Sequence, residues 1–135
     1  HKFISQLPGS RPSLFGLDVL TEKEILLVES PLDVPLLRRF GFQAISHNYG
    51  AQTWEKSWNG LLYPYTITVI PDNDTAGRLG LRHLDLSCNV AVWPKGTPVG
   101  FDCGKLYKSN PDKFVNNINY LITTAVPLSW IKARN

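Results

Sequence analysis

The sequence contains no methionine, and it has only two cysteines and three histidines among 135 residues. Because the chain begins at His1 without any Met, we expect a piece excised from a longer protein. Cys88 and Cys103 stand apart, with no Cys-x-x-Cys pair and no Cys/His cluster, so we expect neither a disulfide scaffold nor a zinc site. This cysteine usage fits a reducing, cytosol-like compartment.

Long apolar runs are also missing. None approaches the ~20 residues of a membrane-spanning helix, and there is no secretory signal pattern, so we expect no membrane partner. The 43% hydrophobic and 19% charged content is typical of a globular domain. We predict an irregular lead-in from an upstream region at 1–20, one main domain at 21–126 and a C-terminal tail at 127–135.

The net charge of +3 is small but unevenly distributed. Residues 93–135 carry six basic and two acidic side chains, whereas the rest of the chain is nearly balanced. Such asymmetry favours a polyanionic partner, and a solvated lysine-rich surface is the alternative.

From residue 24 onward, short apolar runs alternate with segments of helical pattern. We predict strands at 25–28, 43–46, 66–70 and 89–93, and helices at 31–40, 53–61, 74–86 and from 111 onward. This alternation predicts an α/β fold, with a doubly wound, mainly parallel four-stranded sheet flanked by helices.

Acidic side chains follow the predicted strands. Glu29 and Asp33 follow the first, Asp72 and Asp74 the third, and Asp102 a loop after the fourth. Ligands of open parallel sheets bind at the carboxyl ends of the strands, so we expect these carboxylates to converge. Converging carboxylates repel unless a cation joins them, and an all-oxygen set favours Mg²⁺ or Mn²⁺. Such a site indicates nucleotidyl or phosphoryl transfer.

Ordinary structural roles remain open for several of these residues. Ser30 and Asp33 match a capping box, and Asp74 matches the N-cap of an ordinary strand-to-helix turn. The four tryptophans are expected in the core or an interface rather than as platforms for base stacking; they are Trp54, Trp58, Trp93 and Trp130.

Two segments together carry a family resemblance. They are V-E-S-P-L-D at 28–33 and D-N-D-T-A-G-R at 72–78, with Gly50-Ala51 between them. This combination resembles the Toprim domain, and most closely that of bacterial or phage-type DNA primases, which carry E-G-x-x-D and D-x-D-x-A-G-R. The resemblance covers roughly residues 13–122. Ser30 replaces the usual glycine, and Asp102-Cys103-Gly104 lacks the second acid found in many bacterial primases.

The resemblance assigns roles by matching position. It implies that Glu29, Asp72 and Asp74 are catalytic, with Glu29 in acid/base chemistry and all three as metal ligands. Asp33 matches the second acid of the first motif and Asp102 a further acidic motif, which adds both to the expected metal set. Four basic residues complete the site as phosphate or nucleic-acid contacts: Arg78, Lys95, Lys105 and Lys108.

The implied protein is the Toprim catalytic core of a DNA primase, a nucleotidyltransferase (a DNA-directed RNA polymerase) of DNA replication. It would use Mg²⁺ or Mn²⁺ to make RNA primers from nucleoside triphosphates on a single-stranded DNA template. The resemblance also implies a replicative helicase as a partner through regions outside this chain, and the cytoplasm of a bacterial or phage-infected cell as the location.

Two alternatives stay open at this point. The first is another Toprim chemistry on DNA phosphodiesters, that of a nuclease of the overcoming-lysogenization type or of a topoisomerase. The second is a non-catalytic nucleic-acid-binding module that keeps the fold.

Overall fold

The computed structural model describes residues 14–16, 22–47 and 54–134. They form a six-stranded sheet in the order β1-β3-β2-β4-β5-β6. The four inner strands are parallel, and each edge strand is antiparallel to its neighbour. The strands are β1 (Leu14–Phe15), β2 (Glu24–Val28), β3 (Ala44–His47), β4 (Thr66–Ile70), β5 (Asn89–Val90) and β6 (Val126–Pro127).

The central strands are buried on both faces. Along β2, Ile25 and Leu27 belong to one apolar cluster, whereas Leu26 and Val28 belong to another on the opposite face. This division follows the period of two in a strand, in which successive side chains point to opposite faces. The strand reads as a continuous apolar run because both of its faces are covered.

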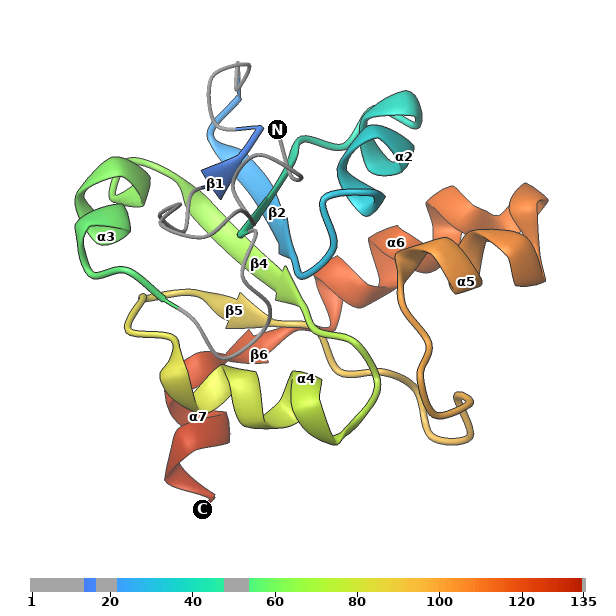
Figure 1. Cartoon of the computed structure of the whole chain (residues 1–135). Coiled ribbons are helices and arrows are strands. Elements are labelled where there is room, and N and C mark those ends of the chain that lie inside the picture. The colour runs from blue at the N-terminus through green and yellow to red at the C-terminus, as the bar shows by residue number, and fades with distance from the viewer. Residues whose placement is uncertain (1–13, 17–21, 48–53, 135) are drawn as a thin grey trace, which may run out of the picture.

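Helices cover each face of the sheet (Figure 1). The first cluster lies under α3 (Ser57–Leu62), α4 (Thr75–Gly80), the 3₁₀ turn η2 (Leu81–His83) and α7 (Leu128–Ala133). The second cluster lies under α2 (Asp33–Arg39), α5 (Cys103–Ser109) and α6 (Phe114–Thr123), with the 3₁₀ turn η3 (Pro111–Lys113) between α5 and α6.

The chain order reverses between β2 and β4. From β2 the chain crosses by α2 to β3 on one side, and it then returns by α3 on the opposite face to β4 on the other side. Such a reversal is a topological switch point, where the connections diverge and leave a crevice beyond the carboxyl ends of the strands. Glu29 and Asp72 follow these two strand ends.

The fold class is confirmed, with two corrections to the predicted sheet. The sheet has six strands rather than four, and the four predicted strands are its parallel interior. The fourth predicted strand, 89–93, is shortened to Asn89–Val90, and the predicted helix 74–86 ends at Gly80 before the turn η2. Gly50-Ala51 and most of the predicted lead-in lie outside the described residues.

Two elements near the C-terminus differ from the prediction. Residues 103–109 form the helix α5, in the stretch between the predicted strand 89–93 and the predicted helix from 111 onward, where no helix was predicted. The expected tail begins with Pro127 of β6 and continues as α7, whose Leu128 is buried in the first cluster. Proline is tolerated in β6 because this strand is an edge of the sheet. Among the described residues, every helix falls short of the length and apolar character needed to cross a bilayer.

Candidate active site

Two acidic side chains meet at the topological switch point. Glu29 directly follows β2, and Asp72 follows β4 after Pro71. The Glu29 Oε2 oxygen accepts a hydrogen bond of 2.6 Å from the backbone N–H of Asp72. This bond joins directly two motifs that stand 43 residues apart in the sequence.

The start of α4 packs tightly against this pair. Asp74 is its N-cap, and Asp74 Oδ1 accepts a hydrogen bond of 2.7 Å from the backbone N–H of Gly77. A Cβ atom at Gly77 would lie only 2.2 Å from the carbonyl oxygen of Asp72 and 3.0 Å from Glu29 Oε2. Only glycine permits this approach, which gives a physical reason for the glycine of the second motif.

Asp102 lies near Glu29 and Asp72 because the loop before Asp102 is hydrogen-bonded to the turn after β4. The backbone of Asn73 donates to Phe101 O and accepts from Gly100 N, both at 2.8 Å. The Asn73 side-chain amide donates to two further carbonyls of that loop, at 3.0 and 3.1 Å. Asn73 is therefore the residue that fastens the loop, a role that sequence reasoning did not assign to it.

Asp33 approaches from α2 and is buried, with 7% of its surface exposed. Its carboxylate accepts a hydrogen bond from the backbone N–H of Gly104 in α5. A Cβ at Gly104 would lie 3.3 Å from Asp33 Oδ1 and 3.4 Å from Asp102 Oδ1, so both carboxylates meet at the start of α5. The capping box expected from Ser30 and Asp33 is not formed, because α2 begins at Asp33 without a side-chain cap. The Ser30 hydroxyl instead accepts a hydrogen bond from Leu32 N at 3.2 Å, in the turn before the helix.

These five carboxylates form one electrostatic cluster, which we call the acidic rim: Glu29, Asp33, Asp72, Asp74 and Asp102. Burial raises the pKa of Asp72 to about 7, and repulsion from the other four carboxylates adds to the shift. Burial, with repulsion from Asp102 and Glu29, raises the pKa of Asp33 to about 6. Burial also raises the pKa of Glu29, although the hydrogen bond from Asp72 N opposes the change.

The donor set of the acidic rim fits a hard divalent cation, because it consists of carboxylate oxygens that repel one another. In the arrangement of the described residues, no three His, Cys, Asp or Glu side chains are grouped as a metal site. Instead, four rim carboxylates accept hydrogen bonds from backbone N–H groups, including Asp102 from Lys105 N at 2.8 Å.

The capping alternative is therefore confirmed for Asp74, and Asp102 caps α5 in the same way. Capping and metal binding do not exclude each other. A carboxylate has two oxygens with about four acceptor positions, so a backbone hydrogen bond to one oxygen leaves the other available to a cation.

The four expected phosphate contacts fall into two groups. Arg78 and Lys95 line a groove that opens beside Asp72. Lys105 and Lys108 lie on α5, and neither is among the described residues that line this groove. Lys105 Nζ instead donates to the carbonyl of Gly100 at 3.1 Å, within the loop before Asp102.

The groove has a volume of about 970 Å³. Its lining includes four residues that were not among the site residues expected from the sequence: Arg82, Tyr120, Trp130 and Arg134. Trp130 is 60% exposed and therefore lies outside the core, whereas Trp58 is buried in the core as expected. A place for Trp130 at an interface stays a prediction. Arg82 lies on η2 and Tyr120 on α6, whereas Trp130 lies on α7 and Arg134 is the C-cap of that helix. No local motif in the sequence joins these three elements.

With this geometry in place, the chain can be compared with known proteins. No family model matches the sequence, and no curated protein matches it. Solved structures do match the fold, and two of them are of DnaG. One is the DnaG primase catalytic domain bound to single-stranded DNA, with a TM-score of 0.64, 21% identity and coverage of 90% of this chain. The other is the DnaG catalytic core, with a TM-score of 0.63, 22% identity and coverage of 87%.

These likenesses define the class of fold. The chain has a primase-like fold, an α/β sheet arranged as in part of the DnaG catalytic domain. The match covers 41% of the length of each of those chains, so the chain corresponds to less than half of either.

Proposed function

We propose that this chain is the metal-dependent catalytic core of a DNA primase, of the Toprim type and closest to the phage-like members. The reaction would be nucleotidyl transfer, in which RNA primers are made from nucleoside triphosphates on single-stranded DNA. Cytoplasmic location and a helicase partner belong to the same proposal.

One observation supports this proposal most strongly. Five carboxylates from α2 and from the ends or following loops of β2, β4 and β5 converge at the switch point, and burial and mutual repulsion raise the pKa values of Glu29, Asp33 and Asp72. Such an arrangement costs folding free energy, and charged groups with raised pKa values concentrate at functional sites.

Glu29, Asp72 and Asp74 would hold Mg²⁺ or Mn²⁺, with Asp33 and Asp102 completing the acidic surroundings. When bound, the metal would supply charge neutralisation for the phosphates of the incoming nucleotide. Glu29 would accept the proton of the attacking hydroxyl, because burial raises its pKa towards the working range of a general base. The hydrogen bond from Asp72 N orients this carboxylate.

The template is proposed from two observations. One neighbour of the same fold is bound to single-stranded DNA. Arg78 and Lys95 also line the same groove as Asp72, where they can contact phosphates. Lys105 and Lys108 would extend this contact along α5.

The proposal is tested by RNA synthesis on a single-stranded DNA template with labelled nucleoside triphosphates in the native protein. We expect short RNA products that depend on Mg²⁺ or Mn²⁺. Glu29→Gln and Asp72→Asn should each lower the rate at least a hundredfold. Asp85→Asn is the matched control, since Asp85 is an exposed carboxylate outside the acidic rim. Unchanged synthesis in both rim variants would falsify the assignment.

The same assay separates the two alternatives. Metal-dependent cleavage of DNA without RNA synthesis would favour the Toprim nuclease or topoisomerase chemistry. Nucleic-acid binding with no metal-dependent product would favour the non-catalytic module.

A further inference from the structure

An exposed aromatic and apolar surface borders the acidic rim. Four of the nine exposed large hydrophobic side chains in the described part of the chain line one groove, the groove beside Asp72: Leu79, Val92, Tyr120 and Trp130. Trp130 and Tyr120 are 60% and 52% exposed. Apolar side chains concentrated on one exposed surface mark an interaction site.

The charge of this groove indicates the kind of partner. Four exposed cations line it: Arg78, Arg82, Lys95 and Arg134. Asp72 is the one acidic residue among its described lining residues, and it stands at the end where the groove meets the acidic rim. The remaining length of the groove therefore complements an anion.

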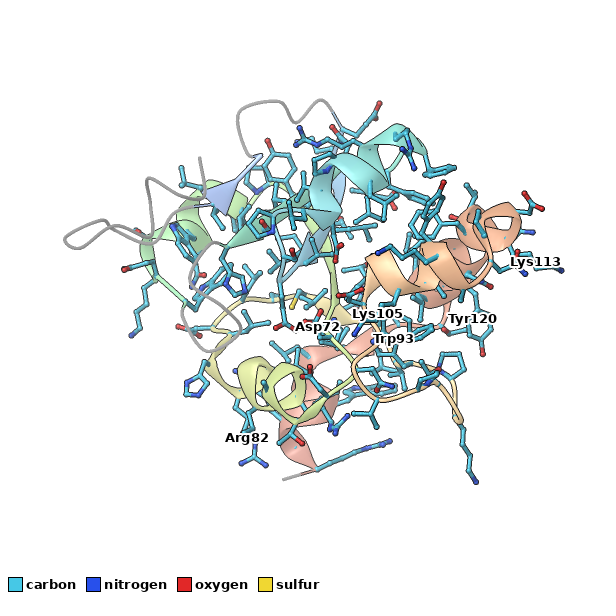
Figure 2. The ribbon with its side chains drawn as sticks, turned by 45° about the vertical axis from the view of Figure 1, so that its right-hand side comes forward. Asp72, Arg82, Trp93, Lys105, Lys113 and Tyr120 are labelled. Carbon is cyan, nitrogen blue, oxygen red and sulfur yellow. The ribbon has the colours of Figure 1, made fainter. Side chains whose placement is uncertain are left out.

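The aromatic residues come from three elements. Trp93 follows β5, and its Nε1–H donates to Pro71 O at 2.7 Å, which fixes its ring close to the turn that carries Asp72. Tyr120 lies on α6 and Trp130 on α7. Figure 2 shows Trp93 between Asp72 and Tyr120, with Arg82 on the side of α4.

We propose that this groove binds single-stranded nucleic acid, with bases stacked on Trp130 and Tyr120 and phosphates contacted by the four cations. The inference rests on the proposed function and deepens it, since the groove leads the strand to the acidic rim. A basic groove with exposed rings is the usual way in which proteins hold single strands without reading sequence. A duplex would not serve, because its base faces are already stacked.

The test measures binding of a fluorescein-labelled dT15 oligonucleotide to the 135-residue chain by anisotropy, in EDTA. Trp130→Ala should weaken binding roughly tenfold through loss of base stacking. Trp130→Phe keeps a ring and should recover most of that loss. Tyr63→Ala is the matched control, because Tyr63 is 88% exposed and lies outside the described lining of the groove.

The role of charge is tested by salt dependence. Arg82→Glu should weaken binding and lower the slope of log affinity against log salt by about 0.7 for each phosphate that the side chain no longer neutralises. Lys113→Glu is the control, because Lys113 is an exposed lysine outside the described lining of the groove. Thermal unfolding establishes that each variant is folded, and Tyr120→Ala replaces Trp130→Ala if the latter is not.

Three results would overturn the proposal. They are unchanged binding in both Trp130→Ala and Arg82→Glu, equal affinity for a dT15·dA15 duplex, and equal displacement of the oligonucleotide by polyglutamate. EDTA removes divalent metal and so prevents the proposed catalysis, whereas binding by the rings and cations of the groove needs no metal. The binding test is therefore independent of the test of catalysis. Oligonucleotide binding that follows the predicted pattern, without RNA synthesis, would uphold the groove while the proposed reaction fails.

Discussion

The acidic rim and the neighbouring groove share Asp72 but are built in opposite ways. The rim consists of carboxylates at the strand ends and helix starts, four of which are held by backbone hydrogen bonds. The groove presents exposed rings and cations from α4, η2, α6, α7 and the segment after β5. The rim therefore brings like charges together at a cost in folding free energy, whereas the groove exposes side chains that are still free to contact a ligand.

The largest effect is expected where the rim is packed most tightly. Gly77→Ala places a Cβ 2.2 Å from Asp72 O, so either α4 or the turn after β4 must shift. We expect a loss of about 3 kcal/mol in the free energy of unfolding, measured by urea titration. Gly60→Ala in α3 is the control, because a Cβ there has nothing within 4 Å and alanine favours a helix. Equal losses in the two variants would contradict the tight packing.

The pH dependence of stability should distinguish the rim from the rest of the surface. The folded-state pKa values of Asp72, about 7, and Asp33, about 6, lie above the ordinary 3.8. The folded chain therefore binds these protons more tightly than the unfolded chain, so stability is lost as the pH rises through 6 and 7. In EDTA, we expect about 2 kcal/mol more stability at pH 5 than at pH 8, after allowing for solvent screening. Urea titration at the two pH values measures this difference in the free energy of unfolding. A lower stability at pH 5 than at pH 8 would contradict the raised pKa values of Asp72 and Asp33.

Removal of one rim charge at pH 8 should recover part of the stability that the protein has at pH 5. Without metal at pH 8, Asp72→Asn should raise the free energy of unfolding by about 1.5 kcal/mol, because it relieves repulsion from the other carboxylates. Its affinity for dT15 should stay within about twofold of the wild type, since phosphate contacts depend on the cations. Thermal unfolding and anisotropy measure the two quantities. A destabilised Asp72→Asn would show that its charge is not repelled.

The smallest expected effect is on stability at Asp102, where two substitutions distinguish the hydrogen bond that caps α5 from the negative charge of the side chain. Asp102→Ala removes the hydrogen bond from Lys105 N and should cost about 1 kcal/mol. Asp102→Asn keeps a side-chain oxygen that can cap α5, so its stability should match that of the wild type or exceed it. Thermal unfolding compares the two. Equal losses would mean that the charge itself stabilises the start of α5.

The sequence was sufficient for the interior of the sheet and for the residues of the rim. The runs at 25–28 and 66–70 read as strands because both faces are buried, and the rim acids could be found because each follows a strand, lies one turn after it or ends a loop. The helix α5 was missed because Gly104 lies in its first turn, a residue that reads as loop, while its stability comes from Asp102 and from buried Cys103.

The groove could not be predicted for a different reason. Arg82, Tyr120 and Trp130 stand on three elements far apart in the sequence, and packing of α7 against the first apolar cluster is what brings Trp130 to the groove. Residues 127–135 were expected only as a C-terminal tail, so the sequence did not predict that α7 would line the groove. Nothing in the residues next to Trp130 indicates that this side chain will lie beside residues of η2 and α6.

The central claim is that the acidic rim binds a divalent cation, and titration of Mn²⁺ into the chain by calorimetry at pH 8 tests it most directly. We predict saturable binding that weakens at least tenfold in Asp72→Asn and is unchanged in Asp85→Asn. Absence of binding in the wild type, or equal binding in all three proteins, would contradict the claim.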